Sequence, residues 1–129
     1  MLQAEYRRLR RAGWSARAAL RAARIRERFE DAESAGLVRF TVQPDECCEV
    51  LDFDGTEREH ADALERANSD GCWGIVSEER CPFCGHWFAV DSVWGFIGDD
   101  WQDSGYDDDV RESALVELGA HVRQGCHCH

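Results

Sequence analysis

The chain has 129 residues, 43% of them hydrophobic, which suffices for one small domain with its own core. Its formal net charge of −11 opposes binding of the whole molecule to the phosphates of a nucleic acid. No window approaches the roughly 18 uninterrupted apolar residues of a membrane span, and no apolar segment follows the Arg-rich start. We therefore expect neither a membrane span nor a secretory signal.

Residues 1–36 predict an Arg-rich helical arm. The helix is expected from Tyr6 to Ala35 with an interruption near Gly13, and Ser15 is a suitable N-cap for its second piece. Residues 1–28 hold nine arginines against two acidic residues, whereas the remainder of the chain is strongly acidic. Five arginines recur at helical spacing and form a basic stripe: Arg10, Arg17, Arg21, Arg24 and Arg28. The arm either contacts nucleic-acid phosphates or folds back onto the protein's own carboxylates.

Residues 37–125 predict an acidic α+β domain. Residues 37–42 alternate in polarity and favour a strand, and Thr56 with Glu59 forms a capping box that opens a helix. Two further strands are expected over 73–79 and 86–96. A last helix is expected over 108–124, with an apolar face made of Val110, Ala114, Leu115, Leu118 and Val122. This order predicts a small antiparallel sheet with helices packed on it.

A C-P-x-C-G sequence lies between the second and third predicted strands. Cys81 and Cys84 have the spacing with which two thiolates hold one zinc ion, and Gly85 allows a tight turn behind them. Two strands joined by such a knuckle form a zinc-ribbon-like hairpin. Reduced thiols and a structural zinc ion are favoured over disulfides, because the chain has seven cysteines and no secretory signal.

Structural zinc takes four ligands, so the knuckle needs partners from elsewhere in the chain. We favour Cys126 and Cys128, which lie in the C-terminal tail of residues 126–129, because the last helix would carry that tail to the hairpin. Cys72 is less apt, and the adjacent Cys47 and Cys48 have diverging side chains. The imidazoles of His86, His127 and His129 stay open as alternatives.

Carboxylates gather in two segments. The turn-rich loop near residue 100 carries Asp99, Asp100, Asp103, Asp107, Asp108 and Asp109, and the helix after Thr56 carries Glu57, Glu59 and Asp62. Carboxylates spaced like backbone phosphates can occupy the DNA-binding groove of another protein, because basic grooves respond to charge pattern. The sequence shows no nucleotide-binding, nucleophile-elbow or metalloprotease motif, so we expect no enzymatic activity.

Several segments resemble small acidic accessory proteins of bacterial phages and plasmids. The resemblance covers most of the chain, and its most specific part is the D-S-x-W-G-F-x-G-D-D segment of residues 91–100. Shorter stretches that share it are residues 6–24, 36–39, 44–46, 73–76 and 104–106. The resemblance implies an accessory protein of a mobile element that acts in the bacterial host cytoplasm. Such proteins often inhibit host defence, including restriction and CRISPR systems, and some are DNA mimics.

Taken together, these features predict a phage or mobile-element protein that inhibits a host nucleic-acid-binding defence complex through an acidic surface. An alternative is a regulator that binds nucleic acid through the basic stripe. Another is a structural or assembly protein, for example a homodimer in which the stripe of one copy pairs with the acidic body of the next.

Overall fold

The computed structural model describes residues 2–46, 55–126 and 128. Within these ranges it confirms the α+β class, with four helices and one three-stranded antiparallel sheet. The elements are α1 (Leu2–Arg11), α2 (Ala16–Ser34), β1 (Val38–Pro44), α3 (Glu57–Asp70), β2 (Cys72–Arg80), β3 (Trp87–Ile97) and α4 (Tyr106–Gln124). Within the same ranges, none of these helices combines the length and apolar character needed to cross a membrane.

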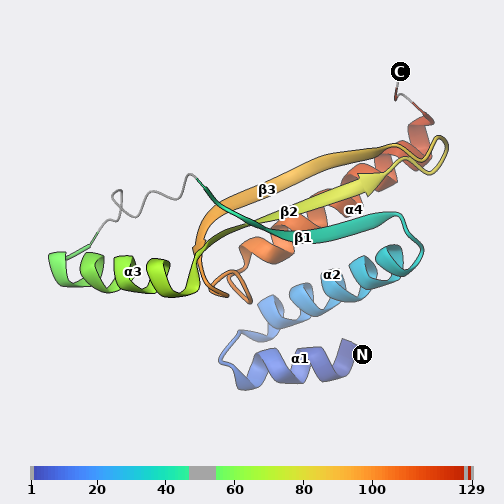
Figure 1. The fold of residues 1–129 in the computed structure, drawn as a ribbon. Helices are drawn as coiled ribbons and strands as arrows, with labels where there is room; N and C mark the ends of the chain where they lie inside the picture. Colours follow the sequence, from blue (N-terminus) through green and yellow to red (C-terminus); the bar gives the residue numbers. More distant parts are fainter. Residues whose placement is uncertain (1, 47–54, 127, 129) are drawn as a thin grey trace.

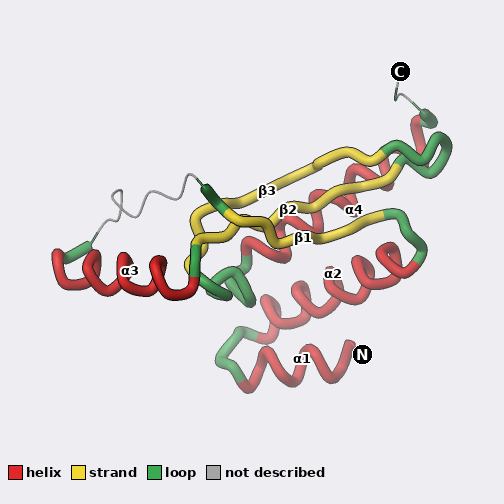
Figure 2. The backbone as a smooth tube through the Cα atoms, in the orientation of Figure 1, coloured by secondary structure: helices red, strands yellow, loops and turns green. Residues whose placement is uncertain are grey.

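The sheet has the order β1-β2-β3, with β2 in the centre. Val38 pairs with Glu79 across β1 and β2, and Cys72 pairs with Ile97 across β2 and β3. α4 lies against β2 and β3, α2 lies beside α4 and reaches β1, and α1 packs on α2 (Figures 1 and 2). The arm is therefore docked on the body of the protein.

The two predicted helix N-caps are present, whereas α1 begins at Leu2 and α4 at Tyr106, earlier than the expected Tyr6 and Asp108. The Ser15 hydroxyl accepts a hydrogen bond of 3.1 Å from the Ala18 N–H, and the Thr56 hydroxyl accepts one of the same length from the Glu59 N–H. Each bond satisfies one of the amides that a helix leaves free in its first turn. Both caps thus form where the sequence predicts them.

The apolar interior lies where α2 and α4 meet the sheet. One buried cluster contains Phe29, Val38 and Ala114, and Leu115 and Leu118 pack against it. The predicted apolar face of the last helix is wrong at Val122, which is 59% exposed. Successive helical residues are about 100° apart, and His121 takes the inward position in that turn, so the next side chain points to solvent.

Candidate metal centre and charged surfaces

The C-P-x-C-G sequence forms the turn between β2 and β3. The Cys81 N–H donates to the His86 carbonyl at 2.8 Å, and the Gly85 N–H donates to the Cys81 carbonyl at 2.9 Å. Gly85 has a φ of +78°, a conformation that residues with a Cβ rarely adopt. The Cys81 side chain is buried at 1% exposure, whereas Cys84 is exposed. The knuckle thus holds one cysteine in the interior and one at the surface.

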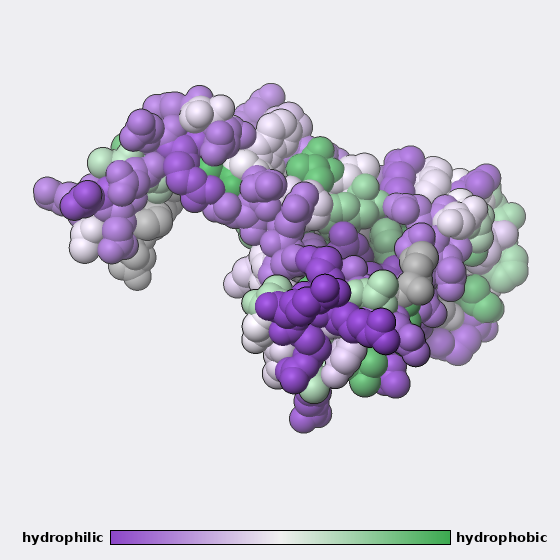
Figure 3. Space-filling view, turned by 90° about the horizontal axis from the view of Figure 1, so that it is seen from below, coloured by the Kyte–Doolittle hydropathy of each residue, from purple (hydrophilic) through white to green (hydrophobic). Residues whose placement is uncertain are grey.

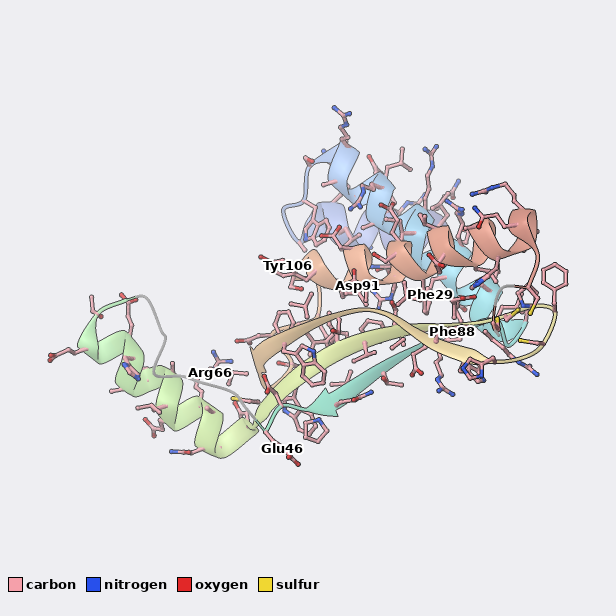
Figure 4. The ribbon with its side chains drawn as sticks, turned by 90° about the horizontal axis from the view of Figure 1, so that it is seen from above. Phe29, Glu46, Arg66, Phe88, Asp91 and Tyr106 are labelled. Atoms are coloured by element: carbon pink, nitrogen blue, oxygen red, sulfur yellow. The ribbon has the colours of Figure 1, made fainter. Side chains whose placement is uncertain are left out.

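The end of α4 brings the tail cysteines to this turn. α4 runs along the hairpin, and its last turn lies beside the β2–β3 connection (Figure 1). Gly125, with a φ of +82°, redirects the chain after the helix. The Sγ atoms of Cys81, Cys84, Cys126 and Cys128 all lie within 4.8 Å of one another. Figure 4 shows the sulfur atoms gathered at this end of the hairpin.

The four sulfurs fit a tetrahedral metal ion. A Zn–S bond of about 2.3 Å places thiolates about 3.8 Å apart in a tetrahedron, so a spread of at most 4.8 Å closes with small movements. Backbone N–H groups of Cys84 and Phe83 lower the pKa of Cys81 to about 6, whereas burial raises the pKa of the Cys128 thiol. These four close cysteines could coordinate a metal ion, and their chemistry is compatible with zinc.

Among the described residues, two other candidate ligands, Cys72 and His86, do not join this cluster. Cys72 is in a disulfide and has no thiolate to offer, so the expectation of reduced thiols is wrong at this residue. His86 is exposed and its ring packs edge-on against Phe88 at a centroid distance of 4.6 Å. Four further candidates lie outside the described residues: Cys47, Cys48, His127 and His129.

The aspartate-rich segment holds the arm in place, and Arg26 lies at the centre of the contact. Its guanidinium donates to both oxygens of Asp108 at 2.8 and 3.0 Å and to Glu5 at 2.6 Å. Asp103 lies 2.9 Å from the same guanidinium. Asp108 is 1% exposed and Asp107 is 2% exposed, so neither carboxylate is accessible to a partner protein. Arg26 was absent from the predicted basic stripe.

Other arginines of the arm extend this network. Arg8 bridges Glu5 and Asp103, and Arg21 lies 3.2 Å from both Asp109 and Glu112. The arm therefore neutralises four of the six aspartates of the predicted acidic loop. Arg10 donates to the Trp14 carbonyl within the arm. The three remaining arginines of the stripe are exposed and form neither an ion pair nor a side-chain hydrogen bond with a described residue: Arg17, Arg24 and Arg28.

The ion pairs of Arg8 with Glu5 and Asp103 should make the stability of the protein depend on pH. Arg8 lowers the pKa of both Glu5 and Asp103 below the usual value of about 4. The contribution of these two carboxylates to the free energy of unfolding is fully present above a pH of about 4. It is lost as the pH falls through their lowered pKa values. Urea unfolding at neutral pH and near pH 3 should show a smaller acid loss in Arg8→Ala than in wild type. Parallel acid losses in the two proteins would contradict this assignment.

The second acidic patch lies on α3, which projects from one end of the sheet (Figure 1). Ala63 is the only buried residue of this fourteen-residue helix. In Figure 3 the projecting part is covered mainly by hydrophilic residues. Five carboxylates of the helix are exposed and form no ion pair with a described residue: Glu57, Glu59, Asp62, Glu65 and Asp70. Arg66 is paired with Asp100 at 2.8 Å, which places the loop carboxylates beside this helix.

No protein-family model, curated protein or solved structure matches this chain. The centre is therefore described by its own geometry, as a cluster of four cysteines that could coordinate a metal ion where the β2–β3 turn meets the end of α4.

Proposed function

We propose that Cys81, Cys84, Cys126 and Cys128 hold one structural zinc ion. Four protein ligands complete a tetrahedral zinc and leave no position for substrate, which is the pattern of structural zinc sites. The ion would connect the β2–β3 turn to the end of α4. It would thus fix the helix that carries the arm-binding aspartates against the sheet.

We further propose that the protein is a non-enzymatic inhibitor that presents α3 to the basic groove of a nucleic-acid-binding defence protein. The observation that carries this proposal is the set of five exposed carboxylates on a projecting helix. At about 1.5 Å per residue, fourteen residues span about 20 Å, which gives about one carboxylate per 4 Å. This spacing is close to the roughly 3.4 Å per phosphate of one DNA strand.

Neutralising α3 should weaken partner binding. The triple variant Glu57→Gln/Glu59→Gln/Asp62→Asn removes three exposed charges, each worth about 0.2–1 kcal/mol in an exposed pair. We expect roughly tenfold lower affinity and a weaker salt dependence. Restriction and CRISPR complexes would first be screened by pulldown, and displacement of labelled duplex DNA from the captured complex would then be measured by anisotropy.

A matched control neutralises three exposed carboxylates at the far end of α2, in the variant Glu30→Gln/Asp31→Asn/Glu33→Gln. This control should displace DNA as wild type does. Equal displacement by the α3 variant and the control would remove α3 from the interface. Capture of no nucleic-acid-binding protein would remove the inhibitor proposal.

A second candidate function is supported by the outer face of α2, where Arg17, Arg24 and Arg28 remain exposed. These guanidinium groups could contact phosphates even though Arg8, Arg21 and Arg26 are paired with the protein's own carboxylates. A gel shift with nonspecific duplex DNA, compared with Arg17→Ala/Arg24→Ala/Arg28→Ala, separates this regulator function from the inhibitor function.

A further inference from the structure

We propose a second, thiolate-free site for a divalent first-row transition-metal ion, formed by Glu79, Glu117 and His121. One carboxylate oxygen from each glutamate and one imidazole nitrogen lie within 4.8 Å of one another. Glu79 comes from β2, and the other two residues come from one face of α4, four positions apart. The site therefore lies between the central strand and the helix that covers it.

The burial of Glu79 distinguishes this cluster from ordinary clusters of acidic residues on a protein surface. The Glu79 side chain is 0% exposed, and its carboxylate oxygens make no hydrogen bond of good geometry with a described residue, although His121 Nδ1 lies 2.5 Å from Oε1. A buried carboxylate that is incompletely hydrogen-bonded is costly, because its lost hydration is not fully replaced. A cation bound to these oxygens would replace that hydration.

His121 is positioned to share such a cation. Its Nδ1 lies 2.5 Å from Glu79 Oε1, yet neither atom has a partner with hydrogen-bond geometry among the described residues. The ring of Phe88, on the β3 surface near α4 (Figure 4), stacks on the imidazole at 5.8 Å between centroids and an angle of 29°. This stacking fixes the imidazole plane while Nδ1 points toward the carboxylate.

A simple Glu–His ion pair explains the cluster less well. A protonated imidazole would balance one carboxylate, but Glu117 brings a second negative group to the same place. Two carboxylates and one neutral imidazole instead match the charge and the ligand preference of a divalent ion such as Zn²⁺, Co²⁺ or Mn²⁺. Three protein ligands leave at least one coordination position for water.

The two metal sites would be neighbours with separate ligands. Glu79 precedes Cys81 by two residues on β2, and His121 precedes Cys126 by five residues near the end of α4. One end of the hairpin would then hold a sulfur-only site and an oxygen–nitrogen site. Their different ligand atoms allow each site to be observed in the presence of the other.

The test is a Co²⁺ titration of protein whose cysteine site has first been filled with zinc. We expect one further equivalent to bind, with visible d–d absorption and without the near-ultraviolet charge-transfer band of a Co–thiolate bond. Atomic emission after dialysis should find one zinc and one cobalt per chain. Displacement of zinc with a thiolate band, or no cobalt uptake, would overturn the proposal.

Two variants locate the ion. Glu79→Gln keeps the shape of the buried side chain, and Glu117→Ala changes an exposed residue and leaves the interior intact. Each should weaken Co²⁺ binding by at least about 10–100-fold, the loss that follows removal of even outer-shell groups from metal sites. Glu65→Ala, at an exposed carboxylate of α3, is the control and should bind as wild type. Unchanged binding in Glu117→Ala would place the ion elsewhere.

Discussion

Replacing Cys81 with serine should abolish zinc binding at the four-cysteine site and unfold the hairpin end of the protein. Structural zinc contributes on the order of 10 kcal/mol to the folding of small domains, which is comparable to the whole net stability of a domain of this size. Cys81 is the buried member of the cluster, so its loss also removes the innermost ligand. Zinc content by atomic emission and thermal unfolding by circular dichroism, with and without chelator, measure both effects.

The control for this prediction is His86→Ala, because His86 is an alternative ligand in the turn but lies outside the four-cysteine cluster. This variant should retain one tightly held zinc and a thermal midpoint close to that of wild type. A Cys81→Ser protein that keeps its zinc and its thermal midpoint would show that the four cysteines do not form a structural zinc site.

Arg26→Met should be the most destabilising change within the arm. Arg26 binds Asp108 and Glu5 directly, and its removal leaves the buried carboxylate of Asp108 without its main partner. Breaking one side of a buried ion pair costs about 3–5 kcal/mol, so the thermal midpoint should fall by roughly 10 °C or more. Chemical denaturation at neutral pH would measure this loss.

Arg24→Met is the matched control, because Arg24 is exposed on the same helix and forms no ion pair with a described residue. Its effect should stay within about 0.5 kcal/mol. The double variant Arg26→Met/Asp108→Asn should recover part of the loss, since the stranded charge is removed as well. Equal stabilities of Arg26→Met and Arg24→Met would contradict the role of this network.

Local signals in the sequence predicted most of the elements. Ser15 and Thr56 cap helices because short hydroxyl side chains reach the free amides of a first turn, and these bonds need no tertiary context. The spacing of Cys81 and Cys84 likewise predicted a turn between two strands, because this signal is also local in the sequence. The position of the tail could be predicted from the length of the last helix. A helix that packs along the hairpin brings residues 126 and 128 to the β2–β3 turn.

Long-range pairing was harder to predict. Arg26 follows Ala19, Ala22 and Ala23 at helical spacing, so it lies on the apolar face of α2 and not in the basic stripe. An arginine at such a position indicates a buried carboxylate partner, but its identity depends on how α2 packs against α4. Glu79 gives a parallel signal, because it alternates with the buried Ile75 and Ser77 on the inward face of β2.

Which acidic residues remain exposed was also difficult to predict from the sequence. Composition identified two groups of carboxylates but contained no information on which group the arm would neutralise. Docking of α2 against α4 buries Asp107 and Asp108, whereas α3 meets the body mainly at β3 and keeps its carboxylates in water. The proposal of partner binding therefore rests on Glu57, Glu59 and Asp62, the smaller of the two predicted patches, together with Glu65 and Asp70.

X-ray absorption at the zinc edge of the purified protein would show whether one zinc ion joins the β2–β3 turn to the end of α4. We expect one zinc per chain at the four-cysteine site, with a first shell of four sulfur atoms at about 2.3 Å. Loss of this shell in Cys126→Ser/Cys128→Ser would assign two of the ligands to the tail. A first shell of nitrogen and oxygen, or purified protein that takes up no zinc, would contradict it.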